Sequence, residues 1–244
     1  MQDKVKVMVV NAIATDRYNK QRLDFLTQVI NPNTQLDMVS IKHGYESLEY
    51  MNQELVNVVD TVRCVKDAEK AGYDSVLINC FFDPGLDEAR ELVRIPVIGA
   101  GEASLFHTSR LGHKFAVLAT SRKSIPIIER HIDAYHLDKK CAGVISLGIG
   151  VPRLQQEGLS EEIKSIVLKQ IDKAIELGAE CLTVGCTASL GIGKQLSDIS
   201  PIPVVDPCII SVKTAEMMGS VYQLTGLSHS KYNAYSYQDE LELK

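Results

Sequence analysis

Short runs of Val, Ile and Leu alternate along the chain with longer stretches in which apolar residues recur every three or four positions. The short runs lack an apolar–polar alternation, which is typical of strands buried on both faces, and the longer stretches have the period of amphipathic helices. Strands that alternate with helices predict an α/β protein with mainly parallel sheets. The expected strands are 5–10, 36–41, 75–78, 97–98, 115–119, 143–147, 181–184 and 204–205, and the expected helices are 17–29, 48–71, 84–93, 102–111, 125–135, 160–177, 190–197 and 208–224.

An internal repeat divides this pattern into two similar halves. The segments AGYDSVLINC (71–80) and LGAECLTVGC (177–186) align without a gap, and each has a glycine, Gly72 or Gly178, eight residues before its final cysteine. Glycine at that place predicts the end of a helix just before a strand. A helix–glycine–strand order is common in α/β proteins and explains the glycines. It does not explain a cysteine at the same register in both copies.

The repeat predicts two pseudo-symmetric lobes, each a mainly parallel sheet flanked by helices. In open α/β sheets the ligand crevice lies beyond the carboxyl ends of the strands. Cys80 and Cys186 both follow such an end, so we expect them to face each other across an active-site cleft between the lobes. The expected parts are lobe one at 1–99 and 207–224, lobe two at 100–206, and a polar C-terminal tail at 225–244 that forms either a loose arm or an oligomer contact.

The composition narrows the classes of partner. Of the 244 residues, 45% are hydrophobic and 23% are charged, with a net charge of −5, which is ordinary for a globular protein. Since no dense Lys/Arg block occurs, neither a nucleic acid nor an anionic membrane is expected as a partner. The apolar runs are far shorter than the ~20 residues of a membrane helix, and the start MQDKVKVMVV lacks a secretory signal pattern. We therefore expect a cytoplasmic protein that acts on a small molecule.

Two of the six cysteines stand out by their position. No C-x-x-C pair and no Cys/His cluster with zinc spacing occurs in the sequence, so we expect free thiols and no metal. Most free cysteines are small buried hydrophobes, and that is our interpretation of Cys64, Cys141, Cys181 and Cys208. The other two, at the ends of the repeats, each precede a predicted helix start, where unpaired N–H groups and the helix dipole favour a thiolate.

Capping residues are available at both of these helix starts. Asp83 and Pro84 fit the N-cap and the first position of the first helix, and Thr187 or Ser189 fits the cap of the second. A thiol pKa, ordinarily near 8.5, would fall toward neutrality there, although the charge of Asp83 opposes the effect. Two such thiols suit proton transfer at a carbon acid: one, as thiolate, removes a proton, and the other returns a proton to the opposite face.

Three segments resemble the hydantoin racemase branch of the aspartate/glutamate racemase superfamily: CFFDPGLDEARELVRIPVIGAGEASLFHTSRLGHKFAVLAT (80–120), VGCTASLG (184–191) and PVVDPCIISVKTAEMM (203–218). The resemblance implies a cofactor-independent racemase with two lobes that forms a homo-oligomer. Cys80 and Cys186 match the two catalytic cysteines of that family. The resemblance also implies a five-membered cyclic ureide, such as a 5-substituted hydantoin or allantoin, as the substrate.

Two departures from the family pattern concern the substrate. The first loop of the family reads N-P-N-T after strand one, whereas VVNAIATDRYN (9–19) keeps only Asn11. The N-P-N-T at 31–34 follows a predicted helix, so we interpret it as a turn. The second cysteine motif reads Cys-Thr-Ala-Ser, where hydantoin racemases have Cys-Ala-Gly, and G-C-T is closer to the amino-acid racemase branch. The identity of the substrate therefore stays open.

Six residues are expected to bind the substrate. Five lie at strand ends or beside the two cysteines, and the sixth, Tyr45, lies in KHGYESLEY, which resembles the family's loop before the second helix. The plainer alternatives are turn formation for Asn11, helix capping for Thr120 and Ser121, and core packing for Phe81. The six are Asn11, Tyr45, Phe81, Thr120, Ser121 and Thr187.

The sequence thus leaves three hypotheses. The first is a racemase or epimerase that uses no cofactor and acts on a hydantoin, allantoin or a similar carbon acid. The second is another enzyme of the superfamily: an amino-acid racemase, a decarboxylase or a cis–trans isomerase. The third is a non-catalytic binding protein that has kept the cleft. Because both cysteines are present, the first hypothesis is favoured.

Overall fold

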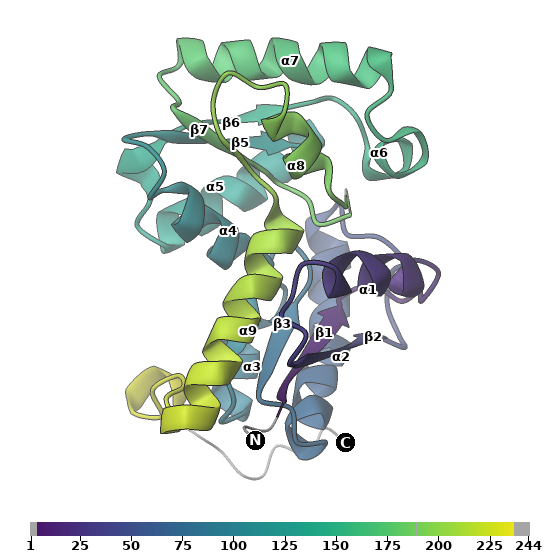
Figure 1. The fold of residues 1–244 in the computed structure, drawn as a ribbon, viewed down its shortest axis with the longest axis vertical. Helices are drawn as coiled ribbons and strands as arrows, with labels where there is room; N and C mark the ends of the chain where they lie inside the picture. The colour runs from purple at the N-terminus through teal and green to yellow at the C-terminus, as the bar shows by residue number, and fades with distance from the viewer. Residues whose placement is uncertain (1–3, 189, 237–244) are drawn as a thin grey trace.

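The computed structural model describes residues 4–188 and 190–236 of the chain. It contains two four-stranded sheets, one in each half of the molecule (Figure 1). The first has the order β2-β1-β3-β4 and the second the order β6-β5-β7-β8, and all neighbouring strands are parallel. The predicted α/β class with two similar lobes is therefore confirmed. The strands are β1 Val5–Asn11, β2 Thr34–Ser40, β3 Ser75–Ile78, β4 Val97–Gly99, β5 Phe115–Ala119, β6 Cys141–Ser146, β7 Cys181–Val184 and β8 Val204–Val205.

Helices flank both sheets. The last helix packs on β1, β3 and β4 of the first sheet and lies along α4 (Figure 1). A late segment of the chain therefore packs against the first strands. The helices are α1 Asn19–Thr27, α2 Met51–Lys70, α3 Leu86–Leu92, α4 Ala100–Thr108, α5 Ile125–Ala134, α6 Val151–Glu157, α7 Glu161–Glu176, α8 Ile192–Ser197 and α9 Pro207–Thr225. Assignment of α9 to lobe one, and the lobe boundaries themselves, stay a proposal.

The two glycines of the repeat end helices in the same way. Gly72 after α2 has φ +77°, and Gly178 after α7 has φ +92°, a backbone conformation that glycine adopts without steric cost. One residue further on, the Tyr73 N–H donates to the Ala68 carbonyl, and the Ala179 N–H donates to Ala174 in the same way. These bonds satisfy carbonyls that the helix end leaves without a partner. Both copies therefore enter β3 and β7 from the same helix ending.

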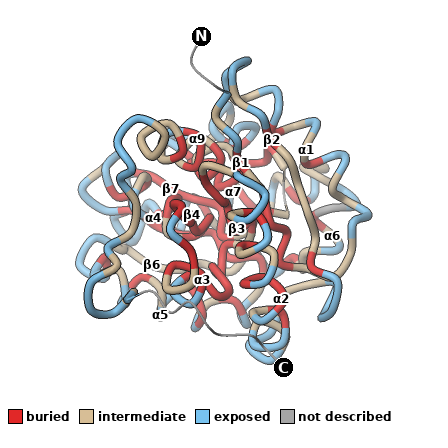
Figure 2. Tube along the Cα trace, turned by 90° about the horizontal axis from the view of Figure 1, so that it is seen from below, coloured by how far each residue is buried: buried red, intermediate tan, exposed pale blue. Residues whose placement is uncertain are grey.

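Buried residues run through the middle of both sheets (Figure 2). Every residue of β3 and β7 is buried, which explains why these segments show no apolar–polar alternation. On each sheet the first strand is central: β1 pairs with β2 and β3, and β5 pairs with β6 and β7. In the parallel register Val10 lies beside Ile78 and Leu118 beside Val184, so the carboxyl ends of these strands lie at the same edge of each sheet.

Helix α6 is absent from the sequence-based expectations. Gly150 and Gly158 bracket it, and Pro152 lies within it, so the segment resembles a loop in composition. Proline is nevertheless well suited to the first turn of a helix, since it lacks only an N–H that the helix cannot use there. Three residues of this short helix, named below, line the principal cleft.

Residues 226–236, the described part of the predicted tail, pack against lobe one. The His229 Nε2 atom accepts a hydrogen bond from the Val97 N–H at 2.9 Å, and the Tyr235 hydroxyl donates to Asp87 Oδ1 at 2.6 Å. The Lys231 ammonium donates to the Arg90 carbonyl. Residues 237–244 lie outside the described part.

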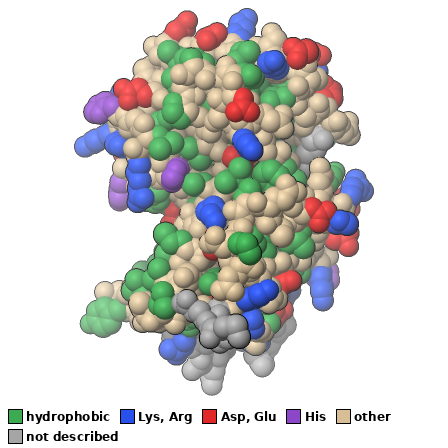
Figure 3. Space-filling model, viewed as in Figure 1, with side chains coloured by type: hydrophobic (Ala, Val, Ile, Leu, Met, Phe, Trp, Pro, Cys, Tyr) green, Lys and Arg blue, Asp and Glu red, His purple; other side chains and the backbone are tan. Residues whose placement is uncertain are grey.

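Acidic and basic side chains are interspersed over the face shown in Figure 3, so the electrostatic field over that face has no single sign. Within residues 4–188 and 190–236, none of the helices is both long and apolar enough to cross a bilayer.

Candidate active site

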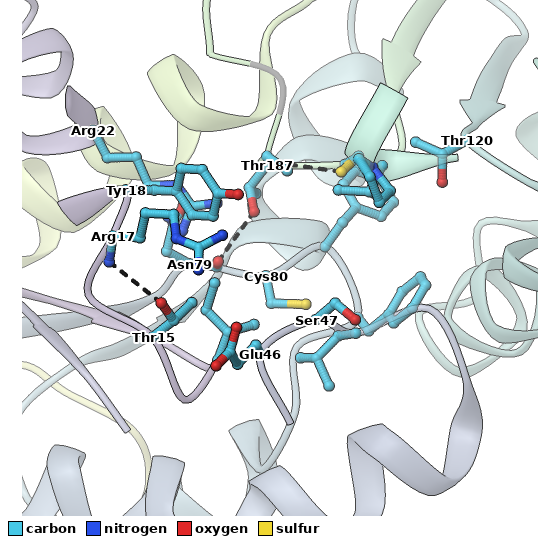
Figure 4. Close-up of a pocket in the computed structure, with 18 of the residues that line it drawn as sticks. Thr15, Arg17, Tyr18, Arg22, Glu46, Ser47, Asn79, Cys80, Thr120 and Thr187 are labelled. Atoms are coloured by element: carbon cyan, nitrogen blue, oxygen red, sulfur yellow. Dashed lines mark hydrogen bonds between the residues drawn. The ribbon is translucent and has the colours of Figure 1, made fainter. Parts of the chain in front are cut away.

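A cleft of about 340 Å³ lies beyond the carboxyl ends of the strands, and both repeat cysteines line it. Its volume falls within the ~300–1,000 Å³ that is usual for small-molecule sites. Figure 4 shows that its walls come from both lobes: Thr15, Asn79 and Cys80 from the first, and Thr120 and Thr187 from the second. Helix α6 adds Val151, Pro152 and Gln156.

The two cysteine loops have the same length and the same ends. Cys80 comes two residues after β3 ends, and Cys186 comes two residues after β7 ends. In each loop the next helix begins six residues after the cysteine and follows a glycine with positive φ, Gly85 at +74° and Gly191 at +70°. The sequence repeat therefore extends through both loops, although the loop sequences differ.

The predicted helix cap beside Cys80 is wrong. Helix α3 begins at Leu86 with Gly85 as its N-cap, so Asp83 and Pro84 precede the helix. Cys80 is half-buried, and burial raises the pKa of its thiol far above the ordinary value, while the Phe82 N–H, which donates to the sulfur, opposes this shift. Burial of Cys80 therefore disfavours its thiolate, which is the opposite of the expected effect.

Asp83 instead caps helix α4. Its carboxylate accepts hydrogen bonds from the Gly101 N–H at 2.8 Å and the Glu102 N–H at 2.7 Å, and from the Tyr135 hydroxyl at 3.0 Å. A Cβ atom at Gly101 would lie 2.2 Å from the Phe81 carbonyl oxygen, which explains glycine at this position. Burial raises the pKa of Asp83 to about 7, and its two backbone donors oppose that rise.

Cys186 has different neighbours. Its sulfur, half-buried like that of Cys80, accepts a hydrogen bond from the Ala188 N–H at 3.3 Å. The Thr187 hydroxyl donates to the Asn79 carbonyl at 3.0 Å and so ties the two cysteine loops together across the cleft. Helix α8 begins only at Ile192, so the predicted cap at Thr187 is also wrong, and Ser189 lies outside the described residues.

A buried polar network lies behind the first cysteine loop. The Arg22 Nη1–H donates to Asn11 Oδ1 at 3.0 Å, and Asn79 Nδ2–H donates to the same oxygen at 2.9 Å. Because a guanidinium can only donate, the Asn11 atom that faces it is the oxygen. Asn79 must then turn its NH₂ group toward Asn11, which leaves Asn79 Oδ1 buried without a hydrogen-bond partner in the described structure. Arg22 and Asn79 both line the cleft.

Of the six predicted substrate-binding residues, Phe81, Thr120 and Thr187 line the cleft with the two cysteines. Asn11 is fully buried behind its wall and holds Arg22 and Asn79.

The other two predicted residues do not line this cleft. Tyr45 is 41% exposed, and its backbone N–H donates to the buried Asn57 Oδ1 at 2.7 Å, so the residues that follow it, Glu46 and Ser47, line the cleft in its place. The Ser121 hydroxyl pairs with that of Ser124 at 3.2 Å, just before helix α5 begins at Ile125.

Sequence reasoning missed Arg22 and Asn79. Asn79 has a local signal, since it directly precedes a candidate catalytic cysteine. Arg22 has none, because an arginine on an amphipathic helix is ordinarily exposed, yet this one is only 4% exposed.

All six cysteines are free thiols. Among the described residues, no three His, Cys, Asp or Glu side chains gather in a way that suits a metal ion. The polar groups that line the cleft thus include two thiols, the buried Arg22 guanidinium and the side chains of Arg17, Tyr18, Glu46 and Asn79.

Comparison with known proteins gives a consistent picture. A family model described as Asp/Glu/Hydantoin racemase matches residues 7–215. A hydantoin racemase from Rhizobium meliloti is 28% identical over 95% of this chain and 94% of its own length. One from Pseudomonas sp. (strain NS671) is 27% identical over 98% and 94%. The solved structure of an allantoin racemase from Klebsiella pneumoniae superposes with a TM-score of 0.87 at 24% identity and covers 99% of this chain and 96% of that one.

Proposed function

Since the chain belongs to the Asp/Glu/hydantoin racemase family, we propose that it racemises a cyclic ureide with Cys80 and Cys186 as a two-base pair. Family membership makes it an isomerase of the racemase type, resembling the hydantoin and allantoin racemases. The use of the two cysteines as bases and the cyclic ureide substrate are what we propose.

One observation carries the mechanism: the two cysteines occupy equivalent places in the two lobes and line the same cleft. In the proposed reaction the thiolate of one cysteine takes the proton from the carbon beside the substrate carbonyl. The electron pair of the broken C–H bond moves onto the carbonyl oxygen as an enolate. The thiol of the other cysteine then gives its proton to the opposite face and becomes the thiolate. Reversing the two roles converts the product back.

The unpartnered oxygen of Asn79 supports a ureide. A buried carbonyl oxygen without a donor costs about 1–3 kcal/mol, and a ligand that brings an N–H group to it recovers that free energy. Hydantoins carry N–H groups beside carbonyls in one small ring. Asn79 lines the cleft and directly precedes Cys80. Its Oδ1 atom is buried, so a turn of the amide is needed to present it to a ring N–H near the sulfur that is proposed to react.

Loss of optical rotation tests the proposal directly. Enantiopure 5-substituted hydantoins, allantoin and free amino acids are incubated with the purified protein in D₂O without added cofactor. We expect the rotation of a hydantoin or allantoin to fall to zero, with deuterium appearing at the chiral carbon in the NMR spectrum.

If only amino acids are racemised, the proposed ureide substrate is wrong, whereas the two-base mechanism still applies. Binding of a ureide without deuterium uptake would support the third hypothesis, a non-catalytic protein. A homo-oligomer and a cytoplasmic location stay expectations from the sequence.

A further inference from the structure

Arg22 is a buried positive charge in the wall of the cleft. It projects from α1, is 4% exposed, and lines the cleft together with both cysteines. It also lines a second cavity of about 160 Å³ between α1 and α8, so it stands where the two spaces meet. Arginine stays protonated in proteins, and burial of an uncompensated charge is costly. A buried charge of this kind indicates that the protein uses it.

In the part of the chain that the structure describes, no carboxylate pairs with this charge. Among the described residues, no Asp or Glu oxygen lies within 4.0 Å of an Arg22 nitrogen. Its recorded partners are the neutral Asn11 side chain, at 3.0 Å, and the ring of Tyr18, whose centroid lies 5.5 Å from the guanidinium carbon. A cation over an aromatic ring gains only about 0.5–2 kcal/mol, which does not replace a counter-ion.

The titratable groups that interact electrostatically with Arg22 are the thiols of Cys208, Cys186 and Cys80 and the phenol of Tyr18. Cys208 is fully buried, and its Sγ–H donates to the Thr187 carbonyl at 3.1 Å, so this sulfur is used as a thiol. The two cysteines of the cleft remain as sites where a negative charge forms beside Arg22.

We propose that Arg22 is the fixed positive charge that stabilises the thiolate in this cleft, whichever of Cys80 and Cys186 carries it. This inference rests on the two-base reaction proposed above. A two-base racemase holds one thiolate and one thiol at any time, and the single negative charge of that pair matches the single positive charge of Arg22. The balance persists during turnover, because the charge passes from the first thiolate to the enolate oxygen and then to the second thiolate.

Apart from the Phe82 N–H, the surroundings of the Cys80 sulfur disfavour a thiolate. Helix α3 begins too late to assist the sulfur, and the carboxyl groups of Asp83 and Glu54 act against a negative charge on it. The other arginine of the cleft, Arg17, is exposed and acts through water, which screens its charge. Asn11, held in turn by Asn79, accepts a hydrogen bond from the Arg22 guanidinium and so helps to fix its position.

The pH dependence of cysteine alkylation tests the proposal without a substrate. Iodoacetamide reacts with the thiolate, and mass spectrometry of the digested protein measures alkylation at each cysteine separately. Arg22→Gln removes the charge and keeps an N–H donor for Asn11. We expect this variant to alkylate the faster of Cys80 and Cys186 about tenfold more slowly at pH 7 and to recover the parent rate about one pH unit higher. Arg22→Lys, which keeps the charge, should restore most of the rate.

Arg17→Met is the matched control, since it removes an exposed positive charge from the same cleft. Its effect on alkylation should be less than about twofold, because the exposed charge is screened. Thermal unfolding of each variant checks its fold, and Arg22→Met provides a second neutral variant if Arg22→Gln does not fold.

A parent-like alkylation profile in a folded neutral variant overturns the proposal. An equal effect of Arg17→Met and Arg22→Gln on the alkylation rate also overturns it, because any positive charge in the cleft would then act on the thiols as Arg22 does. If Arg22→Gln weakens substrate binding and leaves the alkylation profile unchanged, Arg22 binds substrate and the proposal is wrong. Failure to find a ureide substrate would contradict the proposed function, whereas the alkylation result would still decide the role of Arg22.

Discussion

The loops after β3 and β7 have the same length and surround their sulfurs differently. Before the cysteine, each backbone N–H donates to the neighbouring central strand: Asn79 to Val10, and Gly185 to Leu118, both at 2.9 Å. The first lobe has an amide side chain at this place. The second has Gly185, where a Cβ atom would lie in tight contact with Ile128 Cδ1, at 3.0 Å.

The aspartates that accept backbone hydrogen bonds from helix starts also occupy different places in the two halves of the chain. In the first lobe Asp83, inside the cysteine loop, caps α4. In the second lobe Asp206, after β8, accepts hydrogen bonds from the backbone of Gly193 in α8 and of Cys208 in α9. The first sulfur therefore has a carboxylate within its own loop, and the second does not. Pseudo-symmetry places the sulfurs, and the surrounding side chains make them chemically unequal.

The strongest way to break the comparison is to remove one sulfur at a time. Cys80→Ser and Cys186→Ser should each lower racemisation by about 10³-fold, because a serine hydroxyl does not ionise at neutral pH and proton transfer contributes about 10²–10⁴-fold. Each variant should retain deuterium exchange with one enantiomer only, and with opposite enantiomers. Circular dichroism measures racemisation, and proton NMR measures exchange. Two variants that racemise at the parent rate would contradict the two-base mechanism.

A second experiment compares Asp83 and Asp206 through the pH dependence of the free energy of unfolding. Burial raises the pKa of Asp83 to about 7, above the ~3.9 of an unfolded chain, so the folded protein binds this proton more tightly. The resulting contribution to stability is complete below about pH 4 and is lost as the pH rises to about 7. It amounts to on the order of 4 kcal/mol at most.

Asp83→Asn removes this titration, so the free energy of unfolding from urea curves should fall less between pH 4.5 and 7.5 than in the parent. Asp206→Asn is the counterpart in lobe two. Its carboxyl pKa is also raised by burial, so its effect should have the same sign. An Asp83→Asn slope equal to that of the parent would show that another group controls this pH range.

The smallest expected effect concerns the bond that joins the two loops. Thr187→Val removes the hydroxyl that donates to the Asn79 carbonyl at 3.0 Å and should lower the free energy of unfolding by about 1 kcal/mol. Urea unfolding measures this change. If instead kcat/KM falls more than tenfold at unchanged stability, the hydroxyl binds substrate, as the sequence suggested. Thr120→Val, in the same wall without such a recorded bond, serves as the control.

Much of the fold was accessible from local pattern. The β3 and β7 strands begin and end at the predicted residues, because continuous apolar runs bounded by a glycine and a polar loop admit few other structures. Helix α6 was missed because a seven-residue helix between glycines shows too little periodicity. The cysteines could be predicted to share a site since each occupies the same register of a repeated unit.

The sequence by itself determined the α/β class, the repeat and the register of the two cysteines, because these depend on residues close together in the chain. Only the tertiary structure decided what surrounds the sulfurs. Asp83 binds backbone 18 and 19 residues away, and Thr187 binds a carbonyl 108 residues away. Arg22 is buried through the packing of α1 against the strands and α9. Such contacts follow from the way the lobes close on each other, and no local period records them.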